Sequence, residues 1–216
     1  LHRVFPHAEI STTFQMTNEF AKRERIKVLP MSLYYTWSET DLLRSMEELG
    51  LATIFKTTGN LFETTPYIEE VLKNDLVIDF SGEMWGDHAE PVGKKRFLVN
   101  LIKLRIAQLL GKKTALLAGS QGPFNKCPEI DFARLVFENF DIISNRESTS
   151  KELLKTNGFD ITNVQNFTDP AFLFDPASDE DIAEIYAREK IFDEERKTRG
   201  FILCGFNMLE GPYDKE

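Results

Sequence analysis

Short apolar runs rich in β-branched residues alternate with segments of helical periodicity along most of this 216-residue chain. Strands that are separated by helices pair in parallel, because a parallel neighbour is reached only through a crossover connection. The alternation therefore predicts an α/β fold with a Rossmann-like parallel sheet. Ligands of such sheets bind beyond the carboxyl ends of the strands. The residues that follow each predicted strand are the first candidates for a functional site.

The pattern assigns the following elements. Strands are predicted at residues 10–14, 26–29, 75–80, 114–118, 141–144 and 164–167, and helices at 38–49, 67–73, 91–110, 129–140, 146–157 and 178–197. In the first helix, Ser38 and Asp41 have the spacing of a capping box, Leu42, Met46 and Leu49 are predicted to face the core, and Gly50 is predicted to end the helix.

Two domains are predicted. Asp169-Pro170 and the charged helix that follows resemble a crossover between domains, and a new apolar run begins at Phe201. We expect an N-terminal domain at 1–175, a linker helix at 176–200 and the start of a second α/β domain at 201–216. The chain begins with Leu1 and ends soon after this apolar run, which is typical of a piece of a longer protein.

The composition excludes some partners. The net charge is −9 and there is no basic cluster, so a nucleic acid or an anionic membrane surface is not an expected partner. No apolar run approaches the ~20 residues that span a bilayer, and no signal peptide is present. Cys127 and Cys204 lie in unrelated contexts, which favours a reducing compartment. We expect a cytoplasmic protein, with peripheral attachment to a membrane left open.

Three predicted strand ends carry polar residues suited to binding, and the third, 144–148, has the strongest physical argument. Ser144 and Glu147 have capping-box spacing, which places Arg146 in the first helical turn. Free N–H groups and the helix dipole favour an anion there, and an arginine adds a planar fork of donors for phosphate or carboxylate. The alternative is that Arg146 is a solvated surface residue.

The loop Gly119-Ser120-Gln121-Gly122-Pro123 follows the strand at 114–118. It lacks the lysine of a P-loop, and Pro123 has no N–H group to offer a phosphate. Two interpretations remain: a structural turn, or a binding loop in which the Ser120 and Gln121 side chains contact a ligand.

The strand end at 79–83 offers Ser81, Gly82 and Glu83, and Asp87 and His88 follow it. Glu83, Asp87 and His88 are candidate general acids or bases, because they lie in the loop after the strand predicted at 75–80. A solvated histidine and a plain turn are the alternatives. No further histidine or cysteine completes a metal site, so we predict none.

Three more residues are ambiguous. Asp169 before Pro170 is typical of a turn. Trp37 and Trp85 lie in loop-like segments, where Trp85 either stacks on a sugar or covers the edge of the sheet.

Taken in order, these strand ends resemble the polysaccharide pyruvyl transferase family. The similarity rests on "DLVIDFSGEMWGDH", "LLAGSQGPF", "DIISNRESTSKELLKTNG" and "TDPAFLF" and covers residues 4–174, with "FILCGFNML" resembling the first strand of a second domain. The resemblance implies two Rossmann-like domains in a glycosyltransferase-B-like arrangement, with the active site in the cleft. It also implies transfer of a pyruvyl group from phosphoenolpyruvate to two hydroxyls of a cell-surface glycan, as a ketal, without a separate cofactor.

Carried over to this sequence, the resemblance assigns Arg146 to the donor. Together with the chemistry above, it predicts catalytic roles for Arg146, His88 and Glu83, and substrate binding by Ser81, Gly82, Ser120, Gln121, Gly122, Asn145 and Ser148. The expected partners are phosphoenolpyruvate and a saccharide acceptor; association into a homo-oligomer is left open. The alternatives are a glycosyltransferase that uses a nucleotide sugar, whose diphosphate also suits Arg146, and a non-catalytic glycan-binding domain.

Overall fold

The computed structural model describes residues 2–82, 85–87, 89, 95–125 and 127–190. These residues form two parallel sheets, β1-β2 and β3-β4-β5-β6, and seven α-helices. The strands are β1 (Ile10–Thr12), β2 (Ile26–Val28), β3 (Leu76–Asp79), β4 (Lys113–Gly119), β5 (Ile142–Asn145) and β6 (Val164–Asn166). The helices are α1 (Asn18–Arg23), α2 (Thr40–Thr58), α3 (Pro66–Lys73), α4 (Arg96–Leu109), α5 (Ile130–Glu138), α6 (Ser148–Thr156) and α7 (Asp179–Glu189), with 3₁₀ turns η1 (Met31–Leu33) and η3 (Pro170–Leu173).

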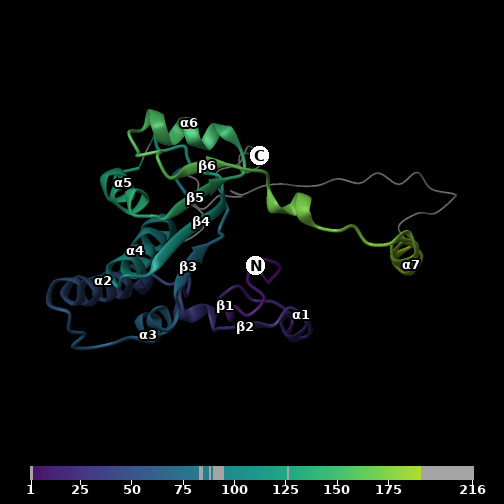
Figure 1. Ribbon diagram of the computed structural model, residues 1–216, viewed down its shortest axis with the longest axis horizontal. Helices are drawn as coiled ribbons and strands as arrows, with labels where there is room; N and C mark the ends of the chain where they lie inside the picture. Colours follow the sequence, from purple (N-terminus) through teal and green to yellow (C-terminus); the bar gives the residue numbers. More distant parts are fainter. Residues whose placement is uncertain (1, 83–84, 88, 90–94, 126, 191–216) are drawn as a thin grey trace, which may run out of the picture.

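The four strands of the larger sheet follow one another in chain order, and each pair is parallel. Every crossover therefore runs in the same direction across the sheet, and right-handed crossovers place their helices on one face. Figure 1 shows α4, α5 and α6 on this common face, with α2 and α3 stacked beyond α4. The predicted α/β class is confirmed, and the parallel sheets are consistent with a Rossmann-like fold.

The main core fills the space between the larger sheet and these helices. Leu116 of β4 and Ile143 of β5 are fully buried against Phe137 of α5. Trp85 is also fully buried, and its ring meets the Phe97 and Phe137 rings edge-on at centroid distances of 6.1 and 5.5 Å. The interpretation that Trp85 stacks on a sugar is therefore wrong, because aromatic rings already occupy its surroundings.

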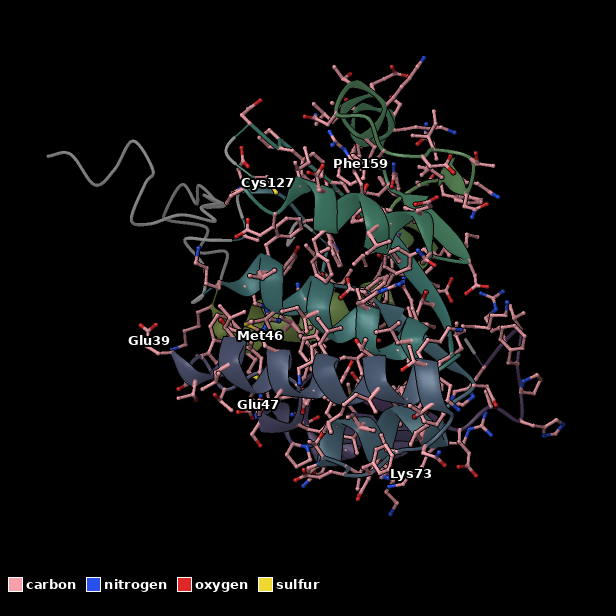
Figure 2. The ribbon with its side chains drawn as sticks, turned by 90° about the vertical axis from the view of Figure 1, so that its left-hand side faces the viewer. Glu39, Met46, Glu47, Lys73, Cys127 and Phe159 are labelled. Carbon is pink, nitrogen blue, oxygen red and sulfur yellow. The ribbon has the colours of Figure 1, made fainter. Side chains whose placement is uncertain are left out.

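Helix α2 ends nine residues later than the sequence predicted, at Thr58 rather than Leu49. Gly50 lies inside the helix, and Gly59, with φ of 72°, ends it in the left-handed conformation. The helix continues because Ala52 and Phe55 extend its apolar face onto the second core cluster. Met46 does not face the core as predicted: it is 55% exposed on the outer side of α2 (Figure 2).

The layer of α2, α3 and α4 contains a buried ion pair. Glu48 of α2 and Lys103 of α4 are 2% and 0% exposed, and the lysine Nζ donates to a Glu48 carboxylate oxygen. Thr65 Oγ1 donates to the other oxygen at 2.9 Å. The Lys103 ammonium also lies 4.0 Å from the centroid of the Tyr67 ring. Burial lowers the pKa of Lys103, which the charge of Glu48 opposes.

We predict that Glu48→Ala lowers the free energy of unfolding by about 3–5 kcal/mol, because it leaves Lys103 buried without a counter-charge. The double variant Glu48→Leu with Lys103→Met should regain most of this loss, since it removes both charges. Urea unfolding monitored by circular dichroism measures both values. Lys113→Ala is the control: it breaks an exposed pair with Asp141 and should cost less than about 1 kcal/mol. Equal losses for Glu48→Ala and Lys113→Ala would contradict this prediction.

The C-terminal part of the described chain stands apart. Helix α7 begins at Ser178, whose side chain accepts from the Asp181 N–H, and none of its residues is buried. It lies away from the body of the molecule (Figure 1). The predicted start of a second domain at 201–216 lies outside the described residues, as do residues 91–94 of the helix predicted at 91–110. The domain boundaries at 175 and 200 stay predictions.

Candidate active site

Three loops that are far apart in the sequence meet at the carboxyl edge of the larger sheet. The Ser120 N–H donates to the Gly82 carbonyl at 3.0 Å, which joins the end of β4 to the end of β3. The Arg146 N–H donates to the Gly119 carbonyl at 3.2 Å, which joins β5 to β4. Residues predicted separately as binding residues are therefore neighbours, as the parallel arrangement requires.

The loop 119–123 depends on its glycines. The pairing of β4 with β5 shifts register between Leu116 and Gly119, and Ala118 there has φ of 54°. A Cβ on Gly119 would lie 2.0 Å from Gln121 Nε2, and one on Gly122, where φ is 97°, would lie 2.8 Å from Leu153 Cδ1. Both glycines are thus closely packed, and the positive φ of Gly122 also disfavours any side chain there. The bulge and the loop set the direction of the residues that follow.

Two predicted binding residues, Gln121 and Asn145, are buried amides. They are 1% and 0% exposed, and among the described residues neither the amide nitrogen nor the amide oxygen of either side chain has a hydrogen-bond partner. They are close together, because Asn145 pairs with Gly119 in the sheet and the Gln121 amide lies over Gly119. Buried amides nearly always find partners, so a water or a ligand group is needed at this place.

The start of α6 differs from the prediction. Glu147, not Ser144, is the N-cap: its backbone is extended, and its carboxylate accepts from the Ser150 N–H at 2.8 Å. It also accepts from Ser120 Oγ at 2.8 Å and from Ser150 Oγ. Arg146 therefore precedes the helix rather than lying in its first turn. The Glu147 carboxylate already occupies the positive end of this helix, so an anion would be bound by the Arg146 side chain and not by the dipole of α6.

The Arg146 guanidinium lies among the three strand ends. Its Nη1 is 3.3 Å from Asp169 Oδ2, and the two side chains are 27% and 35% exposed. A Cβ added to Gly82 would lie 3.9 Å from the same nitrogen, so the end of β3 also borders it. Asp169 caps η3, because its Oδ1 accepts from the Ala171 N–H at 2.9 Å. This confirms its predicted role in a turn, and the ion pair with Arg146 is a second role. The carboxylate of Asp169 shows where a negative group of a ligand can lie.

Asp79, the last residue of β3, was not predicted as a site residue. Its Oδ1 accepts from the Ser81 N–H at 3.0 Å, from Ser81 Oγ at 2.6 Å and from Trp85 Nε1 at 3.1 Å. Burial raises the pKa of Asp79, although these hydrogen bonds and the charge of Arg96 act against it. An acidic residue that ends an apolar strand was the signal in the sequence that pointed to it.

Of the three residues predicted to transfer protons, the structure describes only Asp87. Glu83 and His88 lie outside the described residues. Asp87 joins two loops: its N–H donates to the Pro123 carbonyl and its Oδ2 accepts from the Asn125 N–H, both at 2.8 Å. Ser148 is exposed at the first position of α6. Within the described part of the chain, no group of three His, Cys, Asp or Glu residues is arranged to hold a metal ion.

We predict that Glu147→Gln lowers the free energy of unfolding at pH 7 by about 1 kcal/mol, through the loss of a charged cap. Burial acts to raise the pKa of Glu147, but the hydrogen bonds from Ser150 and Ser120 and the Arg146 charge lower it overall from 4.5. The stabilisation is therefore complete above pH 4.5 and is lost as the pH falls through the folded-state pKa. The difference between wild type and variant, measured by urea unfolding from pH 3 to 7, should shrink on the acid side. The exposed Glu138→Gln should show no such change; a difference independent of pH would refute the role of the charge.

Comparison with known proteins gives one match. The family model described as polysaccharide pyruvyl transferase covers residues 1–209 of the chain. No curated protein and no solved structure matches it. Among the residues that the structure describes, no helix is both long and apolar enough to cross a membrane.

Proposed function

Because the chain belongs to the polysaccharide pyruvyl transferase family, we propose that it takes part in moving a pyruvyl group from phosphoenolpyruvate to a saccharide of a cell-surface polysaccharide, as a ketal. The family match confirms the resemblance found in the strand-end motifs. The donor, the ketal product, the glycosyltransferase-B-like arrangement with a second domain and the cytoplasmic location are parts of this proposal.

The observation that carries the proposal is the position of Arg146. Its guanidinium lies where the ends of β3 and β4 meet, and it faces the carboxylate of Asp169. Phosphoenolpyruvate has a phosphate and a carboxylate, and the planar guanidinium binds either group through two parallel hydrogen bonds. Such a fixed cation also stabilises the charge that develops on the leaving phosphate.

The proposed reaction moves three protons. A proton is added to the methylene carbon of phosphoenolpyruvate, which makes C2 electrophilic, and one sugar hydroxyl bonds to C2 and gives up its proton. The C2–O bond to phosphate then breaks, and a second hydroxyl of the same sugar bonds to C2. Its proton leaves with the phosphate, so the products are the ketal and inorganic phosphate.

Carboxyl groups at this edge of the sheet are the candidates for proton transfer. Asp79 has a raised pKa, which keeps more of it protonated near neutral pH than an ordinary aspartate. Asp79 is only partly exposed, and hydrogen bonds from Ser81 and Trp85 hold its carboxylate in place. Glu83 and His88, which follow β3 in the chain, remain proposed for the same task.

We predict that phosphoenolpyruvate raises the thermal midpoint of the full-length protein and that Arg146→Ala weakens its binding about 10- to 100-fold, as expected for the loss of charged hydrogen bonds. Isothermal titration calorimetry gives the dissociation constants. The control is Arg188→Ala in α7, which breaks only an exposed pair with Glu189 and should bind the donor unchanged. The same titration with a panel of nucleotide sugars tests the alternative donor. A response to nucleotide sugars without one to phosphoenolpyruvate would refute the proposed donor.

We predict that Asp169→Asn tightens the binding of phosphoenolpyruvate by up to about fivefold, because it frees Arg146 from a partly exposed ion pair worth no more than about 1 kcal/mol. Asparagine keeps the oxygen that caps η3, so the turn should persist. Calorimetric titration at low ionic strength measures the change. Weaker binding in Asp169→Asn would show instead that Asp169 orients the arginine.

A further inference from the structure

A second arginine at the same edge of the sheet is enclosed by aromatic rings. Arg96 is the first residue of α4. The centre of its guanidinium lies 4.1 Å from the centroid of the Tyr35 ring, 5.3 Å from that of Trp37 and 5.6 Å from that of Tyr34. Tyr35 is 1% exposed and meets Trp37 edge-on at 5.0 Å. These rings hold the guanidinium in place, and we call Arg96, Tyr34, Tyr35 and Trp37 the arginine cage.

The cage contains hydrogen-bond donors that have no acceptor. Arg96 Nε and Nη1 are buried and unpartnered. One helical turn further along α4, Asn100 is 0% exposed, and its Oδ1 accepts from the Tyr34 hydroxyl at 3.0 Å. Asn100 Nδ2 is left without a partner. Leaving a charged donor unpaired costs more than leaving a neutral one, so this set of donors favours an acceptor that carries negative charge.

Among the residues that the structure describes, no carboxylate fills that place. In the described part of the chain, two other cations of this layer are paired, Arg44 with Asp41 and Lys103 with Glu48, whereas Arg96 forms no ion pair. Asp79 is near enough for the Arg96 charge to lower its pKa, yet its carboxylate bonds to Ser81 and Trp85 instead. Arg96 is a partly exposed residue, and Trp37, 49% exposed, forms the solvent side of the cage.

We propose that Arg96 and Asn100 form an oxyanion-binding site, separate from Arg146, that takes a phosphate or carboxylate group against the wall of the arginine cage. The buried donors supply the hydrogen bonds, and the rings keep the guanidinium in one orientation, which lowers the entropy lost on binding. The site lies near the end of β3, because Phe97, the neighbour of Arg96 in α4, contacts the Trp85 ring, and Trp85 Nε1 donates to Asp79. A ligand with anionic groups at both arginines would span this end of the sheet.

Inorganic phosphate is the first probe, on the full-length protein. Trp37 and Trp85 are the two tryptophans of this chain, and their indole N–H signals are separable by ¹⁵N NMR and assignable with Trp37→Phe. We expect phosphate to shift the Trp37 signal in a saturable way, in wild type and in Arg146→Ala alike. Arg96→Met should weaken this binding about 10- to 100-fold. The Trp85 signal, from an N–H bound to Asp79, reports on the end of β3 in the same spectra.

Two further variants separate binding from folding. Arg96→Lys keeps the charge but loses the planar fork, and it should bind phosphate severalfold more weakly than wild type with the thermal midpoint retained. Arg105→Met, on the same helix and outside the cage, should leave phosphate binding unchanged. A phosphate response that is absent in wild type, or equal in wild type, Arg96→Lys and Arg96→Met, would overturn the proposal and leave only buried water at these donors.

Two more titrations show whether the anionic group belongs to the donor or to an acidic saccharide. If phosphoenolpyruvate loses affinity in Arg96→Met and glucuronate does not, the site takes an anionic group of the donor; the reverse result assigns it to an acidic saccharide. This site does not require the proposed function. Phosphate bound at Arg96 in a protein that ignores phosphoenolpyruvate would refute the proposed donor and support the oxyanion site.

Discussion

The parallel pairing of β3, β4 and β5 is the constraint on which the candidate site depends. Parallel strands end at the same edge, so the loops after each of them are brought together whatever their separation in the sequence. Two backbone hydrogen bonds complete this arrangement: Ser120 to Gly82 and Arg146 to Gly119. Without them, the Arg146 side chain would have no fixed relation to the glycine at the end of β3.

Packing on the helical face makes this edge rigid. Trp85 follows β3, lies in the main core and donates to Asp79, so the same residue joins the hydrophobic core to the polar site. Gly119 and Gly122 leave room for the Gln121 and Leu153 side chains, which lie close to the backbone of the loop after β4. Several polar groups at this edge nevertheless lack partners, among them the Gln121 and Asn145 amides. Natural proteins tolerate such unsatisfied groups chiefly at functional sites, where a ligand or water completes them.

Two arginines with different surroundings border the end of β3. Arg146 is paired with Asp169 and partly exposed, so its partner can be exchanged for a ligand at small cost. Arg96 is held by rings and has unpartnered donors, so a ligand would satisfy groups that the protein leaves unsatisfied. A donor with both a phosphate and a carboxylate, such as the one proposed here, offers two anionic groups for two such cations.

The sequence determined the α/β class, most strand positions, the strand ends that carry polar residues and the family, because hydrophobic periodicity and short motifs are local properties. Only the tertiary structure decided which residues meet. Gly50 failed to end α2 because Ala52 and Phe55 pack on the second core, and Trp85 became a core residue because Phe97 and Phe137 surround it. Glu147 replaced Ser144 as the cap because Ser120, from another loop, donates to it. No signal in the sequence linked Arg96 to Asp79, since their proximity arises from tertiary contacts: Phe97 of α4 meets Trp85, and Trp85 donates to Asp79.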